Sequence, residues 1–207
     1  MGAGFYIKEN LVATARHVVD GCTRATVENN DGKSSEGTVI IKETDLDIAF
    51  ISTEATIASI VTIDKGPRTR GEAISIVGAP INGLVLSSGR LKNYDPTSKE
   101  FRITLDIPAD HGNSGGPVFS EKGLIGLIVA KSDFGSIYAY DQEQIDEALA
   151  AKSNSRTEDV QMMISNNSEL ENLLLASSLF NGAFLIVIAV LFAKRKRYNK
   201  NQVVINL

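Results

Sequence analysis

Short runs of apolar, often β-branched residues separated by polar turns make up the first two thirds of the chain. The turns contain the residues that favour tight reversals, such as Asn82-Gly83 and Lys65-Gly66-Pro67. Many short strands with no helical period between them predict an all-β sandwich or barrel. The apolar runs cover residues 4–7, 11–15, 38–41, 48–51, 73–77, 84–91, 101–105, 117–119, 124–130 and 136–140.

The first clear helical pattern begins only at Asp141. This residue can cap the backbone amide of Gln144 while the Gln144 side chain reaches back, which is a capping box. Ile145, Ala148 and Leu149 then share one face, so we expect a helix that packs against the β domain. The pattern therefore assigns residues 1–151 to one domain and the polar residues 152–170 to a linker.

An apolar segment follows the linker. Residues 173–193 contain no ionisable side chain, and the run is long enough to cross a bilayer as a helix. A buried core helix is the competing interpretation, but a Lys-Arg-Lys-Arg sequence at 194–197 is a typical membrane flank. The sequence thus predicts a single transmembrane helix over 171–193 and a basic tail over 194–207, with membrane lipid as a partner.

The orientation of this predicted span is open to two interpretations. The basic tail favours a cytoplasmic C-terminus, with residues 1–151 on the outer side. The first ten residues lack the basic start and apolar stretch of a signal peptide, so a tail-anchored chain with residues 1–151 in the cytosol is the alternative. We favour the first, because the charge bias is a direct physical constraint.

Charge and cysteine content narrow the function classes. The chain carries a formal charge of −4, and the tail holds five basic residues and no acid, which leaves −9 on residues 1–193. An acidic body argues against nucleic acid as a partner. The single Cys22 excludes an intramolecular disulfide and makes no structural zinc site, and we expect neither a metal nor a cofactor. Nothing in the composition indicates an oligomeric state.

The sharpest chemical signal is the glycine-dense stretch HGNSGGP at 111–117. Glycines around Ser114 allow backbone conformations closed to other residues and expose successive N–H groups to a small anion. An acyl-transfer nucleophile needs this arrangement: a reachable hydroxyl, with the amides of Gly112 and Ser114 directed at the developing oxyanion. A plain turn between two strands is the competing interpretation.

A serine nucleophile needs a base, and the chain has two histidines. His111 belongs to the serine loop itself, whereas His17 ends an apolar strand, where it could lie at a crevice or serve as an ordinary turn residue. An acid should orient the imidazole. Asp45 and Asp47 both precede the apolar run IAF, and alternation alone does not choose between them.

Three segments carry these residues in the order TARHVV, DLDIAF and GNSGGPVF. Together they resemble the trypsin/chymotrypsin-like serine proteases, and the lack of disulfides makes the chain most similar to the HtrA branch of that family. GAGFYI before the first segment, and AISIVGAP followed by SSGRL before the last, fall in the family's order. The resemblance covers roughly residues 2–149, and three motifs in one order are far more specific than any one of them.

The resemblance implies roles and a fold. His17 becomes the general base, Asp47 the residue that orients it, and Ser114 the nucleophile, with Gly112 and Ser114 forming the oxyanion hole. Asp47 is preferred to Asp45 because the family's acid directly precedes an Ile-Ala pair. The implied fold is two antiparallel six-stranded barrels. The strand that usually precedes GAGFYI is missing, so either the first barrel is incomplete or the sequence lacks its N-terminus.

The same resemblance implies a specificity pocket. Its walls are Leu127, Ile128 and Val129, and Pro108 stands where Arg- or Lys-specific enzymes have an acid. Small or medium aliphatic side chains are therefore expected on the acyl side of the cut. Asp110 remains an alternative occupant of the pocket.

The sequence thus predicts a membrane-anchored serine endopeptidase that acts on polypeptides, with protein quality control as a candidate role. A catalytically silent protease fold that binds peptides or serves as a scaffold is the first alternative. Inactive relatives typically lose part of the triad, and this chain has all three residues. An enzyme with the same chemistry acting on small esters or amides is the second alternative.

Overall fold

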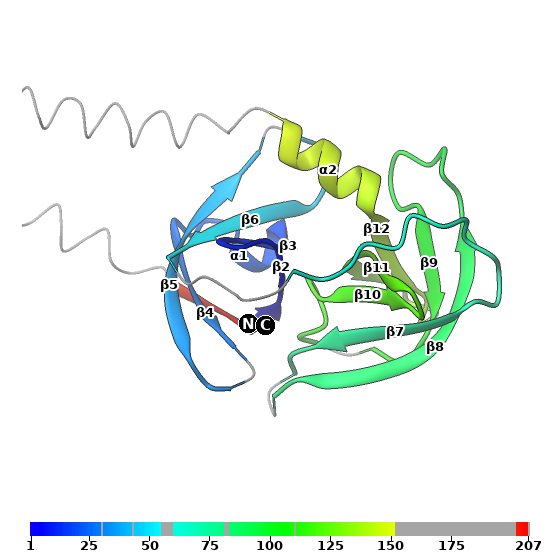
Figure 1. The fold of residues 1–207 in the computed structure, drawn as a ribbon, viewed down its shortest axis with the longest axis horizontal. Helices are drawn as coiled ribbons and strands as arrows, with labels where there is room; N and C mark the ends of the chain where they lie inside the picture. Colours follow the sequence, from blue (N-terminus) through cyan, green and yellow to red (C-terminus); the bar gives the residue numbers. More distant parts are fainter. Residues whose placement is uncertain are drawn as a thin grey trace, which may run out of the picture.

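The computed structural model describes residues 1–29, 31–42, 44–54, 60–80, 83–109, 111–151 and 202–206. These residues form two β units with two helices (Figure 1). The predicted linker, 152–170, and the predicted span, 171–193, lie outside the described residues. Within the described ranges, no helix has the length and apolar character needed to cross a membrane.

The C-terminal unit is a closed barrel of six strands, in the order β10-β11-β12-β9-β8-β7. Every neighbouring pair is antiparallel. For this unit the predicted six-stranded antiparallel barrel is confirmed. Its strands are β7 (Ala73–Gly78), β8 (Val85–Tyr94), β9 (Ile103–Asp106), β10 (Pro117–Ser120), β11 (Gly123–Lys131) and β12 (Ile137–Asp141).

The N-terminal unit differs from the expectation. It is a seven-stranded sheet in the order β1-β13-β4-β5-β6-β3-β2. Strand β13 (Gln202–Asn206) lies between β1 and β4 and runs parallel to both. The prediction of a six-stranded, wholly antiparallel barrel is therefore wrong here. The other strands are β1 (Gly2–Ala3), β2 (Phe5–Lys8), β3 (Leu11–Ala15), β4 (Arg24–Glu28), β5 (Ser34–Ile41) and β6 (Ile48–Thr53).

Strand β13 bears on the predicted place of the tail. A single crossing by residues 171–193 would carry residues 202–206 to the opposite side of the membrane from residues 1–151. The structure instead pairs them with the domain's own strands, and both chain ends lie close together in Figure 1. In this arrangement residues 202–206 are on the domain's side, because sheet hydrogen bonds cannot form across a bilayer.

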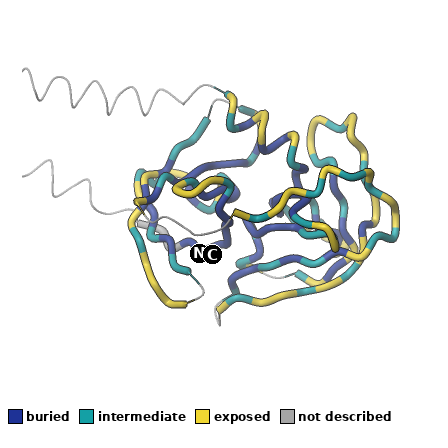
Figure 2. The backbone as a smooth tube through the Cα atoms, viewed as in Figure 1, coloured by how far each residue is buried: buried dark blue, intermediate teal, exposed yellow. Residues whose placement is uncertain are grey.

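Apolar residues fill each unit and the seam between them. The burial pattern along the tube in Figure 2 shows dark, buried stretches on the inner strands of both units. One cluster joins the units, because residues of the N-terminal unit such as Phe5 and Phe50 pack with Leu127 and Tyr140 of the barrel. The two units are therefore held together by a continuous hydrophobic core rather than by a linker alone.

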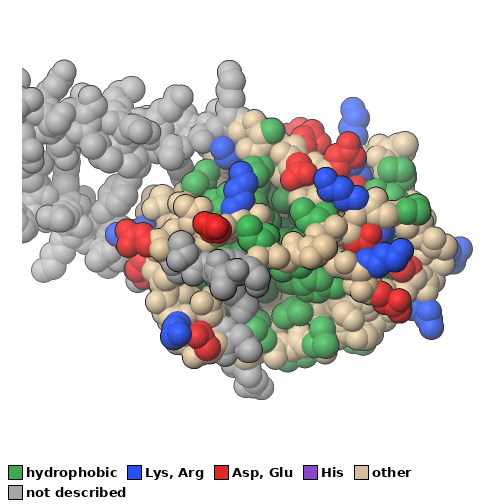
Figure 3. All heavy atoms as spheres, viewed as in Figure 1, with side chains coloured by type: hydrophobic (Ala, Val, Ile, Leu, Met, Phe, Trp, Pro, Cys, Tyr) green, Lys and Arg blue, Asp and Glu red, His purple; other side chains and the backbone are tan. Residues whose placement is uncertain are grey.

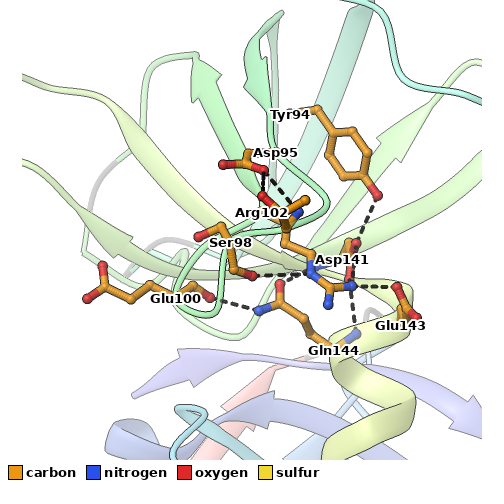
Figure 4. A network of polar contacts seen from close by, with 9 residues as sticks. Tyr94, Asp95, Ser98, Glu100, Arg102, Asp141, Glu143 and Gln144 are labelled. Atoms are coloured by element: carbon orange, nitrogen blue, oxygen red, sulfur yellow. Dashed lines mark hydrogen bonds and ion pairs between the residues drawn. The ribbon is translucent and has the colours of Figure 1, made fainter.

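Helix α2 (Gln142–Ala150) follows β12 and packs on strands of both units. Its predicted capping box is present, with Asp141 accepting from the Gln144 amide and the Gln144 side chain accepting from the Asp141 amide. Arg102 donates to Asp141 and Glu143, which ties β9 to the start of the helix (Figure 4). The helix thereby fixes the end of β12. On the face drawn in Figure 3, apolar side chains lie in separate patches toward the middle, and charged side chains of both signs lie mainly above and beside them.

Candidate active site

His17 and Asp47 meet in the N-terminal unit. His17 belongs to the short helix α1 (Arg16–Val19) directly after β3, and Asp47 directly precedes β6. Because β3 and β6 are paired with Ala15 opposite Ile48, the two residues emerge at the same end of the sheet. The imidazole Nδ1 lies 2.5 Å from Asp47 Oδ2, and the His17 backbone N–H donates to Oδ1 at 2.8 Å.

This contact sets the protonation of the imidazole. The hydrogen bond that the imidazole donates to the Asp47 carboxylate raises the pKa of His17 above its ordinary value of 6.5, and partial burial opposes that rise. With Nδ1 bound to the carboxylate, Nε2 is the nitrogen left to exchange a proton with a substrate. Asp45, the alternative acid, is exposed to solvent.

A residue of the barrel holds Asp47 in place. The Asp47 backbone N–H donates to the hydroxyl of Tyr140 on β12 at 3.0 Å. Tyr140 is buried, and that burial raises the pKa of its phenol. A side chain of one unit therefore fixes the acid of the other. The sequence placed Tyr140 in a strand, but nothing in the local pattern marked it as part of the site.

The Ser114 loop depends on two glycines with positive φ. Gly112 has φ +100° and Gly115 has φ +85°. A Cβ on Gly115 would come within 2.1 Å of the Ala3 carbonyl oxygen and 2.4 Å of Thr14 Oγ1. Only glycine fits that close approach. The loop is also tied to the strands around it, since Gly115 N–H donates to the Ile128 carbonyl at 2.8 Å.

The loop leaves two amides available for an anion. Among the hydrogen bonds of the described residues, neither the Gly112 N–H nor the Ser114 N–H donates to another protein group. Backbone N–H groups of this kind, at a glycine-rich turn, can stabilise the oxyanion of a tetrahedral intermediate. The two amides are those that the sequence assigned to the oxyanion hole.

Ser114 and His17 line the same cavity, which has a volume of about 470 Å³. In the described part of the chain, no hydrogen bond joins the Ser114 hydroxyl to the imidazole. Such contacts often tighten only when substrate binds. The structure thus brings the predicted nucleophile and the predicted base, from different units, to one open site. The other lining residues are Met1, Val18, His111, Gly112, Val129, Ala130 and Lys131.

Of the three residues predicted to form the walls of the specificity pocket, the structure places one at the cavity and two away from it. Val129 lines the cavity, whereas Leu127 and Ile128 are 0% and 2% exposed and pack in hydrophobic cores. The expectation that Leu127 and Ile128 form the walls is therefore corrected: along β11 they point into the protein, not into the cavity. Pro108 is exposed, and Asp110 lies outside the described residues.

Lys131 is a lining residue that the sequence reasoning missed. Its ammonium donates to the Ala109 carbonyl at 2.8 Å, and its side chain borders the cavity that holds Ser114. Its position after Val129 and Ala130 at the end of β11 was the available signal.

Comparison with known proteins identifies the family of the chain. Residues 2–127 match the trypsin-like peptidase domain family, so the chain belongs to that family. A putative serine protease HhoB from Synechocystis is 31% identical over 141 residues, which are 62% of this chain and 34% of that protein. A probable periplasmic serine protease do/HhoA-like from Haemophilus influenzae is 29% identical over 142 residues, 63% of this chain and 30% of that protein.

A solved structure shows the same fold. The inactive form of the Ser343Ala mutant of Rv3671c from M. tuberculosis has a TM-score of 0.63 and 21% identity, covering 72% of this chain and 80% of that one. The predicted family, trypsin-like and most similar to the HtrA branch, is confirmed. The chain spans about a third of the length of the two relatives described above.

Proposed function

We propose that the protein is a serine endopeptidase that cleaves polypeptides through an acyl-enzyme. The observation that carries the proposal is the 2.5 Å contact between His17 Nδ1 and Asp47 in a cavity that also holds Ser114. That contact leaves Nε2 as the proton acceptor in the cavity that Ser114 also lines. Among the described residues, the amides of Gly112 and Ser114 donate to no other protein group. Each part of the arrangement has a role in acyl transfer.

In the proposed reaction, Ser114 Oγ attacks the scissile carbonyl carbon as its proton passes to His17 Nε2. The amides of Gly112 and Ser114 bind the oxyanion, and Asp47 stabilises the imidazolium. His17 then protonates the leaving nitrogen, the C–N bond breaks, and an acyl-enzyme remains. Water attacks this ester with His17 as base, which releases the acid and returns the proton to Ser114.

The experiment is covalent labelling with a fluorophosphonate probe, followed by mass spectrometry of the labelled peptide, with unfolded casein as the companion substrate. We expect modification at Ser114 and cleavage of casein, with both lost in Ser114→Ala. Correct folding without labelling or cleavage would support the alternative of a silent peptide-binding module. Labelling with hydrolysis of small esters but not of casein would support the small-substrate alternative.

The proposed specificity is for small or medium aliphatic side chains on the acyl side of the cut. Val129 supplies an apolar wall, and Lys131 puts a positive charge on the cavity border that opposes Arg and Lys. A peptide library would test this. Preferred cleavage after Arg or Lys would overturn it.

We further propose that residues 171–193 attach the protein to a membrane. Residues 1–151 form the protease domain and face the extracytoplasmic side, and residues 152–170 link the domain to the attached segment. The relative named as periplasmic supports that side. The basic residues at 194–197 supported it only while the tail was expected across the membrane. Since β13 lies on the domain's side, this charge argument no longer applies, and the cytosolic arrangement is the alternative to test.

Protease accessibility of tags placed before Gly2 and after Leu207, in sealed right-side-out membranes from the native source, distinguishes the arrangements. Digestion of both tags agrees with an extracytoplasmic domain and a docked tail. Protection of both would place the domain in the cytosol. Digestion of the N-terminal tag alone would restore the single crossing and contradict the docked strand.

A further inference from the structure

Strand β1 depends on β13 for its place in the sheet. Among the described strands, β1 lies at the sheet edge and pairs with β13 alone, with Gly2 opposite Ile205 and Ala3 opposite Asn206. Strand β1 has only two residues, and its ladder with β13 is the one strand pairing it makes among the described strands. Any process that removes β13 therefore removes the ladder that holds β1.

Strand β13 is anchored through Ile205. This side chain is 0% exposed and packs in a core cluster of the N-terminal unit that includes Val12, Val27 and Val39. A Cβ on Gly4 would lie 3.1 Å from Ile205 Cγ2, so the backbone approaches the side chain closely. On its other edge the strand pairs with β4 over Arg24–Glu28. The position of β13 is thus a defined site for one strand, and not a loose contact.

Strand β1 in turn contacts the catalytic groups. The Ala3 N–H donates to the Ser114 carbonyl at 2.9 Å, and Thr14 Oγ1 donates to the Ala3 carbonyl at 2.7 Å. A side chain on Gly2 would come within 2.6 Å of Val18, the residue after His17. Strand β1 therefore lies between β13 on one side and the nucleophile and base segments on the other.

We propose that residues 202–206 of the same chain are a positioning element of the active site: their docking between β1 and β4 holds β1, and β1 holds the backbone of Ser114. This inference rests on the proposed function. It assigns a role in the reaction to a segment separated in sequence from the protease domain by residues 152–201. It also makes activity depend on residues 202–206 being on the domain's side of the membrane.

The test compares four detergent-solubilised full-length proteins and a truncation: wild type, Ile205→Ala, Val39→Ala, Leu86→Asp and a chain ending at 201. The readouts are the rate of fluorophosphonate labelling at Ser114, the thermal midpoint, and hydrogen exchange of the β1 and β4 amides. Val39 lies in the same core on β5, so it controls for lost stability. Leu86 is an exposed apolar residue of the barrel and controls for surface substitution.

We expect the truncation to label on the order of 10–100-fold more slowly, because small displacements of a catalytic group are costly. Ile205→Ala should slow labelling more than Val39→Ala does at an equal loss of thermal midpoint. A synthetic peptide of residues 201–207 should restore the labelling rate of the truncated protein, and a scrambled peptide should not. If the truncated chain does not fold alone, the comparison of Ile205→Ala with Val39→Ala at an equal loss of thermal midpoint decides the test.

Three results would overturn the proposal. The first is unchanged labelling and unchanged exchange in the truncated chain. The second is equal slowing by Ile205→Ala and Val39→Ala, since β13 would then act on stability alone. The third is recovery of the truncated chain on mixing with Ser114→Ala protein, because the strand would then come from a second copy. Absence of labelling in the wild type is a failure of the proposed function instead, and exchange of the β4 amides would still report docking.

Discussion

The two β units are assembled in different ways. The barrel of residues 73–141 closes on itself with six strands, all antiparallel. The N-terminal sheet contains seven strands and includes residues 202–206 in parallel pairing. The Ser114 loop belongs to the barrel, whereas His17 and Asp47 lie on the sheet. In the proposed function, the more self-contained unit supplies the nucleophile, and the unit that includes the separate strand β13 supplies the base and the acid.

The position of the site between the two units indicates which contacts it depends on. The His17–Asp47 pair depends on the register of β3 and β6, but also on Tyr140 from the barrel. Ser114 depends on its own loop, but also on Ala3 from the sheet. Each unit therefore holds a candidate site residue of the other in place. A substitution in one unit should consequently affect the activity that depends on the other.

The largest expected effects come from removing one catalytic group from each unit. Ser114→Ala and His17→Ala should each lower kcat/KM by about 10⁴-fold or more. The double variant should be little worse than either single one, because the groups act as a unit. Steady-state kinetics with a fluorogenic peptide checks this. Additive losses would mean that the two units contribute separately.

Within the sheet, Asp47→Asn should cost nearly as much, about 10³–10⁴-fold, because an amide favours the wrong imidazole tautomer. Asp45→Asn is the matched control and should stay within about threefold, since the exposed Asp45 is a surface residue. The same kinetic assay measures both. A severe Asp45→Asn with a benign Asp47→Asn would reverse the assignment of the acid.

Across the seam, Tyr140→Phe should remove the acceptor of the Asp47 amide. We expect a loss of about 1–2 kcal/mol in the free energy of unfolding and about a three- to tenfold fall in kcat/KM. Tyr138→Phe is the control, because Tyr138 lies on the same strand and stacks on Phe101. Denaturant unfolding and kinetics measure the two effects. Equal behaviour of both variants would remove Tyr140 from the site.

The pH dependence of kcat/KM should report the titration of His17, which belongs to the N-terminal sheet. The base must be neutral, and Asp47 raises the pKa of His17, so kcat/KM should rise with pH through a midpoint above 6.5. The residual activity of Asp47→Asn should have a lower midpoint, because the carboxylate no longer favours the imidazolium. A pH–rate profile of both proteins checks the sign. An unchanged midpoint would contradict the role of the contact.

The smallest expected effect is on selectivity at the barrel's side of the cavity. Lys131→Glu should raise cleavage of substrates with Arg or Lys next to the scissile bond, relative to aliphatic ones, by about three- to tenfold. Lys122→Glu makes the same charge change at the β10–β11 turn and should leave the ratio unaltered. Competing peptides in one reaction give the ratio directly. A ratio that Lys131→Glu does not move would take this residue out of substrate selection.

The local sequence pattern was sufficient to predict most of the strands, the start of helix α2 and three candidate site residues. Apolar runs and turn residues predict most of the strands, because strand burial follows a short period that is visible in a few residues. The capping box at Asp141 and Gln144 is likewise local. Ser114, His17 and Asp47 could be proposed because their segments keep recognisable spacing and order.

Only the tertiary structure decided which groups meet. Strand register brought Asp47, and not Asp45, to His17. Packing placed Leu127 and Ile128 in hydrophobic cores. It also brought Tyr140, Ala3 and Lys131 to the site. The tertiary structure also paired residues 202–206 with β1 and β4, a pairing that no local sequence pattern could predict. The physical reason is that periodicity specifies which face of an element is buried, whereas contacts between distant elements depend on how whole sheets pack and on which edge remains open.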